Sequence, residues 1–185
     1  MPNWCMNSLT ISTGTAGEGR EALQALVEAA TNEHDEQRAF LQHMHPMPED
    51  LNDTTAPSEG LNWHMWRVSH WGTKWEVDAD LDIVEDDEDG SLEICCNFSS
   101  AWSPPIDALA HFSEANPDLH LSLSYWEPGM AFVGEWTSDG VDEHYEYSTY
   151  TSKTIREHIP ERLIADWDLQ YELEQWEEME EEEAH

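Results

Sequence analysis

Residues 75–84 alternate apolar and acidic side chains, and this alternation constrains the fold more than any other pattern in the chain. Successive side chains of a β-strand point to opposite faces, so such a strand has one apolar and one acidic face. An Asp89-Gly90 pair, typical of a tight hairpin turn, precedes a second apolar run over residues 91–98. The pattern therefore predicts an antiparallel hairpin with one face buried against a core.

Other segments predict the rest of the sheet and the helices that cover it. Alternation predicts strands over residues 7–12, 119–125, 130–136 and 141–150, and the apolar run 39–44 is a candidate edge strand. Helical spacing predicts a helix over residues 18–30, and Ser103-Pro104-Pro105 is typical of the start of a second helix, with Ser103 as its N-cap. This order matches the α+β class, with a split β-α-β antiparallel sheet and helices on one face.

An acidic helix is expected at the C-terminus. Residues 160–183 carry an apolar stripe that includes Leu163, Trp167 and Tyr171, and after Trp176 almost every residue is Glu. The expected organisation is a sheet domain over residues 1–150, followed by an acidic helical extension over residues 151–185.

Charge is the second strong feature of the chain. The 185 residues have a formal net charge of −34, from 41 acidic and 7 basic residues. Residues 1–75 hold only 10 of the acids but 4 of the bases, so the acidity belongs to the remainder. Ten tryptophans and a hydrophobic fraction of 39% exclude a disordered acidic chain and predict a packed core.

The cysteines and the N-terminus bear on the compartment. Three cysteines do not form a disulfide framework, and the adjacent Cys95 and Cys96 should point to opposite faces of one strand. The sequence begins without a basic and then apolar leader, and no stretch approaches the roughly 18 apolar residues of a membrane span. We therefore expect a cytoplasmic protein without membrane contact.

Five short motifs occur in a fixed order. They are Pro2-Asn3-Trp4-Cys5 with Asn7, Pro46-x-Pro48, Trp71-Gly72-Thr73-Lys74-Trp75, Ala101-Trp102-Ser103-Pro104-Pro105 and Tyr125-x-Glu127-x-Gly129. Over roughly residues 1–137, they resemble the YubB-like proteins, a family carried by phages and plasmids. The resemblance implies a ferredoxin-like α+β fold and carriage on a mobile element. It implies no activity, substrate, cofactor or catalytic residue, and the acidic hairpin and Glu-rich helix depart from the family pattern.

No catalytic or metal centre is predicted. The chain lacks a Gly-x-Ser-x-Gly elbow, a phosphate-binding glycine loop and a His-Glu-x-x-His motif. His43 and His45, like His64 and His70, lack the i, i+4 spacing of helical zinc ligands, and residues 86–90 lack the twelve-residue calcium-loop pattern. We therefore expect no enzyme activity, no cofactor and no metal ion.

A tryptophan-rich segment is a candidate pocket for a small ligand or a peptide. Gly72 permits a tight backbone turn, around which indole rings could stack on a ligand. The candidate pocket residues are Trp71, Lys74, Trp75 and Trp102. The structural alternative is that these tryptophans pack under the sheet, with Lys74 paired to a carboxylate.

The acidic surface is the main candidate site. Seven basic residues are too few to form a positive groove, so direct binding to nucleic acid or to an anionic membrane is excluded. Carboxylates at every second strand residue are roughly 6.6 Å apart, so two strands and a Glu-rich helix together approach the charge density of B-DNA, about one charge per 1.7 Å. The candidate partner-binding residues are Asp78, Asp80, Asp82, Glu85, Asp86, Asp87, Glu88, Asp89, Asp139, Asp142, Glu143, Glu146, Glu172, Glu174, Glu177 and Glu178.

The expected function is that of a phage or plasmid accessory protein. It would bind and inhibit a basic nucleic-acid-binding host protein, such as a CRISPR or restriction effector, through this DNA-mimicking surface. One alternative is a ligand-binding module, which includes an enzymatic one, centred on residues 71–75. Two others are adaptation to a salt-rich cytoplasm and acidity that serves only solubility, and the lower acidity of residues 1–75 argues against the former. The sequence leaves the oligomeric state open.

Overall fold

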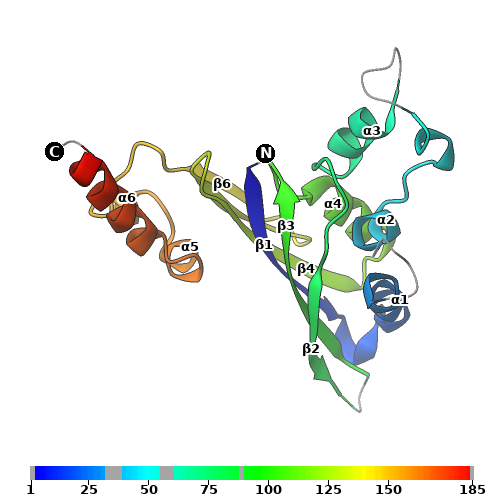
Figure 1. Cartoon of the computed structure of the whole chain (residues 1–185). Coiled ribbons are helices and arrows are strands. Elements are labelled where there is room, and N and C mark those ends of the chain that lie inside the picture. Colours follow the sequence, from blue (N-terminus) through cyan, green and yellow to red (C-terminus); the bar gives the residue numbers. More distant parts are fainter. Residues whose placement is uncertain (1–2, 32–38, 55–60, 88–89, 184–185) are drawn as a thin grey trace.

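A six-stranded antiparallel sheet organises the molecule. The computed structural model describes residues 3–31, 39–54, 61–87 and 90–183. The strand order is β2-β3-β1-β4-β5-β6, with β1 in the interior between β3 and β4 (Figure 1). The strands are β1 (Trp4–Thr13), β2 (Asp80–Asp86), β3 (Leu92–Ala101), β4 (Leu119–Glu127), β5 (Phe132–Thr137) and β6 (Asp142–Glu146).

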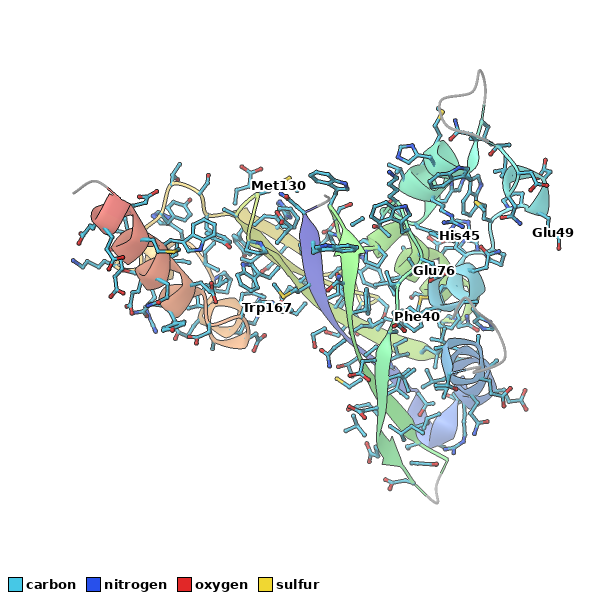
Figure 2. All side chains as sticks on the ribbon, in the orientation of Figure 1. Phe40, His45, Glu49, Glu76, Met130 and Trp167 are labelled. Carbon is cyan, nitrogen blue, oxygen red and sulfur yellow. The ribbon has the colours of Figure 1, made fainter. Side chains whose placement is uncertain are left out.

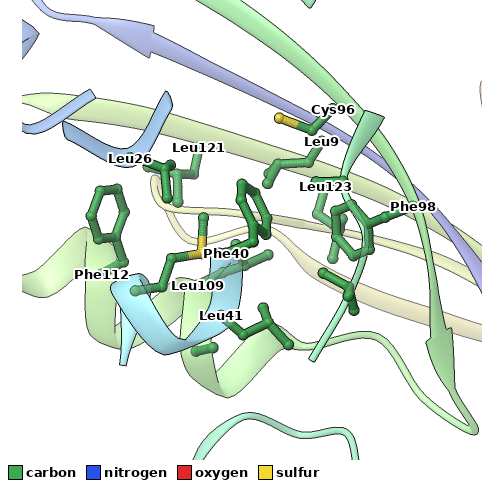
Figure 3. Packing of buried hydrophobic residues seen from close by; sticks show 14 of the residues in the cluster. Leu9, Leu26, Phe40, Leu41, Cys96, Phe98, Leu109, Phe112, Leu121 and Leu123 are labelled. Atoms are coloured by element: carbon green, nitrogen blue, oxygen red, sulfur yellow. The ribbon is translucent and has the colours of Figure 1, made fainter. Parts of the chain in front are cut away.

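Four helices lie on one side of this sheet and cover its main core (Figure 1). They are α1 (Arg20–Thr31), α2 (Phe40–Met44), α3 (Trp63–His70) and α4 (Ile106–Ala115). Alternate strand residues point into this layer, and Leu9, Ile11 and Ile94 are fully buried there. Phe40 of α2 meets Phe98 of β3 with ring centroids 5.7 Å apart (Figure 3). The apolar alternation of the strands therefore has the structural role predicted for it.

The C-terminal segment packs on the opposite side of the sheet. After a 3-10 turn over Ile155–Glu157 it forms α5 (Glu161–Asp166) and α6 (Leu169–Glu183). Within β4, Tyr125 points into the main core and its neighbour Trp126 into a second core with α5 and α6. Three fully or almost fully buried residues, Leu163, Ile164 and Leu169, belong to this second core. The predicted extension over residues 151–185 is thus attached to the sheet by apolar packing.

The surface of β1, β2 and β3 on the α5 side carries polar side chains from β2 and β3. Asp80 and Asp82 of β2 lie opposite Asn97 and Cys95 of β3 in the ladder, so all four side chains are on this face. Asn97 is exposed and Cys95 is half-buried, whereas Cys96 points into the core. The prediction that Cys95 and Cys96 occupy opposite faces is confirmed.

The run 39–44 is the helix α2, so the prediction of an edge strand there was wrong. The Glu76 carboxylate accepts hydrogen bonds from the backbone N–H of Leu41, at 2.6 Å, and of Gln42, at 2.9 Å. These bonds satisfy backbone donors at the start of the helix, where no intrahelical acceptor is available. The capping carboxylate comes from a segment 35 residues away, which local periodicity cannot reveal.

The predicted strand over 75–84 is only partly formed, because β2 begins at Asp80. Val77 and Ala79 are nevertheless buried, so the alternation marks burial without a paired strand. The last ladder pair at this end of β2 joins Asp80 to Asn97, and β3 continues past it to Ala101. Beyond Asn97 the outer edge of β3 therefore has no pairing with β2.

Helix ends also differ from the prediction. The single helix predicted over 160–183 is broken between α5 and α6, where Asp168 has a φ of 49°. Ser103 is not the N-cap of α4, which begins at Ile106; its hydroxyl instead donates a hydrogen bond to the Gly72 carbonyl. Within the residues that the structure describes, no helix is both long and apolar enough to cross a membrane.

Candidate functional site

Four of the sequence motifs meet at one end of the sheet, where β1 begins and β3 ends. The Trp102 N–H donates to the Asn3 carbonyl at 3.0 Å, and the Thr73 hydroxyl donates to the Ala101 carbonyl at 2.9 Å. A side chain added at Gly129 would lie 2.8 Å from the Asn3 amide nitrogen. We call this region, formed by residues 3–7, 71–75, 101–105 and 125–129, the motif end.

Gly72 fixes the turn through which the 71–75 segment reaches this end. Its φ is +82°, and a Cβ there would lie 3.0 Å from the Pro104 carbonyl and 3.2 Å from a carboxylate oxygen of Asp107. Trp71, next to it, is fully buried, and its indole N–H donates to the His45 carbonyl at 2.7 Å. Trp71 is therefore a core residue, as the structural alternative predicted, and it does not line a pocket.

Two tryptophans of the motif end are accessible, whereas Trp75 is half-buried and Trp126 is buried. Trp4 and Trp102 are 48% and 45% exposed, large fractions for indole side chains. The rings of Trp4 and Trp75 have centroids 6.0 Å apart, and the Lys74 ammonium lies 4.7 Å from the Trp75 ring centroid. The structural alternative predicted that Lys74 pairs with a carboxylate. The contact found is a cation–π contact with Trp75. Trp102 has a φ of 72°, an unfavourable conformation for a residue with a side chain.

A groove of about 860 Å³ opens beside Trp4, where β3 runs on past the end of its pairing with β2. Met6, Asn97 and Ser99 contribute to its lining from β1 and β3, and Trp167 contributes from the turn between α5 and α6. Figure 2 shows Trp167 beside the sheet. Its indole N–H donates to the Ser124 hydroxyl at 2.8 Å, which fixes the ring against β4.

Three acidic side chains line the same groove. Asp78 and Asp80 are exposed along it, and the half-buried Glu76 also contributes to its lining. Burial raises the pKa of Glu76, although its backbone hydrogen bonds to α2 and to Val77 partly oppose this shift. The groove therefore combines aromatic walls with a concentration of negative charge. This combination favours a cationic ligand over an anionic one.

Asn7, one of the lining residues, has a buried amide side chain. Its side chain is 2% exposed, and its Nδ2 donates to the Cys5 carbonyl, the Phe98 carbonyl and the Ser100 hydroxyl. Because Nδ2 makes all three bonds to acceptors, the amide orientation is settled, and Oδ1 accepts no hydrogen bond from the described residues. An unpaired buried acceptor costs about 1–3 kcal/mol of stability.

The acids of the predicted hairpin lie along the β2 edge. Asp80, Asp82 and Asp87 are exposed, whereas Asp86 accepts a hydrogen bond from Arg20 at 2.5 Å. Glu85 is exposed as well. The predicted site residues Glu88 and Asp89 lie outside the described residues.

A second group of acids lies at the other edge of the sheet. Asp142 and Glu146 of β6 are exposed, and Asp139, in the turn before β6, lies 3.6 Å from the His120 ring. Glu143 is engaged, because it accepts from Arg162 and from the Tyr145 hydroxyl, each at 2.8 Å. With six strands in the order given, the two edges are about 24 Å apart.

The α6 acids form a third group. Glu174 and Glu178 are exposed and Glu172 is half-buried. Glu177 accepts from the Ser152 N–H at 2.8 Å and from its hydroxyl at 2.9 Å, and these hydrogen bonds lower its pKa. The predicted acidic residues thus form three separate groups and not one continuous face, and several of them have structural partners.

The histidines pack against aromatic rings. His45 stacks on His111 with centroids 3.7 Å apart, and its Nδ1 lies 3.0 Å from the His70 carbonyl. His70 stacks in turn on Trp66 at 4.4 Å. Across residues 3–31, 39–54, 61–87 and 90–183, no three His, Cys, Asp or Glu side chains are grouped so that they could hold a metal ion.

The fold is that of an α+β protein with a ferredoxin-like domain. Residues 70–184 match the family described as the ferredoxin-like domain in Api92-like protein, and the chain belongs to this family. The crystal structure of protein api92 from Yersinia pseudotuberculosis is similar, with 15% identity and a TM-score of 0.41 over 81% of this chain and 99% of that chain. No curated protein matches the chain. The family match reaches α6, whereas the resemblance in the sequence covers roughly residues 1–137.

Part of the groove was missing from the sequence prediction. Trp4 and Asn7 belong to the motifs behind the resemblance, which offered a signal for them. Trp167 was assigned to the apolar stripe of one long helix, and only the break at Asp168 places it at the groove. None of the predicted pocket residues lines the groove itself. Trp75 packs against Trp4, which does line it.

Proposed function

We propose that this protein is a non-enzymatic accessory protein of a phage or plasmid that binds and inhibits a host nucleic-acid-binding protein. The target class is a CRISPR or restriction effector whose basic groove normally receives DNA or RNA. The observation that carries the proposal is the charge distribution. Residues 76–185 hold all but 10 of the 41 acids and only 3 of the 7 bases.

Two of the three cations of the acidic half pair with carboxylates of the protein itself. Arg156 pairs with Glu161 at 2.5 Å, and Arg162 pairs with Glu135 and Glu143. These pairs neutralise a small part of the charge and leave Asp80, Asp82, Asp142 and Glu146 exposed. A basic partner therefore meets a strongly negative surface with little competing positive charge.

Carboxylates on a rigid sheet resemble phosphates in two physical respects. They attract a basic surface over distances of about a Debye length, roughly 8–10 Å at physiological salt, and so accelerate encounter. They also release the counterions of the basic groove on contact, as nucleic acid does. Because the two acidic edges are separated, we propose that each contacts its own basic patch, as two phosphate strands would.

The test is a competition experiment with a candidate effector of the host. The protein should bind the effector more weakly as salt rises, be displaced by duplex DNA, and reduce DNA binding by the effector. A variant with both acidic edges neutralised should bind at least about tenfold more weakly, since each lost contact contributes several tenths of a kcal/mol or more. The edge variant carries Asp80→Asn, Asp82→Asn, Asp142→Asn and Glu146→Gln.

A control variant removes the same charge from exposed positions on the helical side. It carries Glu21→Gln, Glu28→Gln, Asp50→Asn and Glu114→Gln. Binding close to that of the unchanged protein would localise recognition to the edges. Equal loss in both variants would contradict a defined mimic surface, and the absence of competition with DNA would contradict the inhibitory role.

A second candidate function is a small-ligand or peptide-binding module. The groove beside Trp4 and the exposed indoles of the motif end favour it. The predicted centre at residues 71–75 shifts accordingly, because Trp71 is core and the accessible space lies between Trp4 and Trp167. Binding of a small molecule with no salt dependence, together with no binding to basic proteins, would favour this function over the first.

A further inference from the structure

We infer that the groove between Trp4 and Trp167 is a subsite for an arginine side chain, presented by an extended segment of the basic partner. The inference rests on the proposed function for the identity of the partner as a basic protein. It adds a recognition element that depends on shape and hydrogen bonding, whereas the acidic edges act by charge alone.

The walls of the groove suit a guanidinium group. Trp4 is 48% exposed beside the groove, and Trp167 lines it from the α5–α6 turn. Tryptophan is the best aromatic partner for a cation, and the planar guanidinium also stacks on its ring. The same chemistry already occurs within the protein, where the Arg67 guanidinium carbon lies 4.6 Å from the Trp71 ring centroid.

The charge in the groove excludes anionic ligands. Glu76, Asp78 and Asp80 line it, in a molecule with a net charge of −34. A phosphate or a carboxylate ligand would meet like charge there, and the described lining contains no Lys or Arg. A cation is therefore the ligand for which the electrostatic interaction is favourable.

Hydrogen-bonding geometry distinguishes arginine from other cations. Asp80 supplies an exposed carboxylate, and the exposed Asn97 and Ser99 add further polar groups to the lining. Arginine presents five N–H donors in a rigid plane, so it can reach a carboxylate and a second polar group together. The compact lysine ammonium is more strongly hydrated and cannot stack as a plane.

The groove also has room for the chain that carries the arginine. Its volume of about 860 Å³ exceeds what one side chain fills, and it follows the part of β3 that β2 leaves unpaired. The remaining space can hold the residues on either side of the arginine. The proposed occupant is therefore an arginine with its flanking residues.

The test uses three blocked peptides of the form Gly-X-Gly-X-Gly, in which both X residues are arginine, lysine or citrulline. Citrulline keeps the shape of arginine without its charge. Calorimetry at moderate salt should show that the affinity is highest for the arginine peptide, lower for the lysine peptide and lowest for the citrulline peptide. Trp4→Ala should weaken the arginine peptide about tenfold, and Trp4→Phe should weaken it less, because a smaller aromatic ring remains.

Matched controls separate the groove from general charge. Trp176→Ala removes an indole that is 40% exposed on α6, and Asp142→Asn removes one charge at the distant β6 edge. Both should leave peptide affinity nearly unchanged, whereas Asp80→Asn should weaken it severalfold. Citrulline binding as tight as arginine binding, or equal effects of Trp4→Ala and Trp176→Ala, would overturn the inference.

The two proposals fail in different experiments. Loss of peptide selectivity with retained, DNA-competitive binding to an effector would remove the arginine subsite and keep the mimic function. Selective peptide binding at the groove without competition against DNA would keep the subsite and remove the mimic function.

Discussion

Asn7 and Trp102 hold positions at the motif end that are unfavourable in isolation. The unpaired Oδ1 of Asn7 and the positive φ of Trp102 each cost on the order of 1–3 kcal/mol. Surrounding contacts keep both in place, among them the hydrogen bond from the Trp102 N–H to the Asn3 carbonyl. Two such positions in one region make the motif end a candidate functional region, because residues held in unfavourable conformations cluster at functional sites.

His45 makes stability depend on pH. Burial lowers its pKa, and the neighbouring His111 and His70 lower it further, while a backbone hydrogen bond and Asp107 oppose the shift. As the pH falls through about 6.5, His45 therefore binds a proton more readily in the unfolded chain than in the folded protein. The free energy of unfolding decreases over this range as a result. His45→Gln should flatten the stability curve between about pH 7.5 and pH 5.5.

Urea unfolding at the two pH values measures this difference. His158→Gln is the matched control, because His158 is exposed and stacks only on Tyr150 in the described structure. Burial raises the pKa of Glu76, which has the opposite sign and is present in every variant, so it cancels in the comparison. A curve for His45→Gln as steep as that of the unchanged protein would contradict this role of the histidine stack.

Among the elements, α5 and α6 depend most on contacts that are distant in sequence. Their apolar residues cover Trp126 and Val133, on the face of the sheet away from α1 to α4. The break at Asp168 turns the chain so that Trp167 reaches Ser124. The C-terminal segment therefore completes both the second core and one wall of the groove.

Deletion of residues 161–185 should destabilise the protein strongly. It removes Leu163, Ile164 and Leu169, each of which contributes about 1.5–3 kcal/mol when fully buried, so a loss of about 5 kcal/mol is expected. Deletion of residues 179–185 should leave the melting temperature nearly unchanged, because no described residue in that stretch is buried. Thermal unfolding with a dye for exposed apolar surface measures both. Equal melting temperatures would mean that the second core adds nothing to stability.

Local patterns predicted those elements whose burial alternates regularly. Leu9 and Ile11 marked β1, and Leu119, Leu121 and Leu123 marked β4, because each strand has one face in the core. The same reasoning assigned a strand to Val77 and Ala79, which are buried without ladder partners. Alternation reports burial, and pairing depends on where the neighbouring strand lies.

The candidate site was less accessible to sequence reasoning. The acidic residues were identified by type, but their division between two sheet edges follows from the strand order, which composition does not contain. The groove exists because β2 begins only at Asp80 and because the chain turns at Asp168, between α5 and α6. Both are consequences of tertiary packing. The motif residues Trp4 and Asn7 and the predicted site residues Asp78 and Asp80 carried a local signal, but their meeting at one groove did not.

At the scale of the whole molecule, the net charge of −34 opposes compactness. Salt should therefore stabilise the protein by several degrees between about 10 and 150 mM, as the Debye length falls from roughly 30 to 8 Å. The gain should level off beyond this range if screening is the cause. Adaptation to a salt-rich cytoplasm instead predicts a continued rise toward molar potassium chloride. Melting temperatures across a potassium chloride series distinguish the two, with the four-site edge variant as a less charged reference.

The strand order has a consequence for crowding. Both edge strands of the sheet, β2 and β6, carry exposed carboxylates. Edge-to-edge pairing of two copies would therefore bring like charges together. Addition of one copy to another, the route by which open sheets grow into fibres, is thereby discouraged at each end. The proposed mimic function requires a concentration high enough to compete with nucleic acid for one target, and this charge arrangement favours such a concentration without polymerisation.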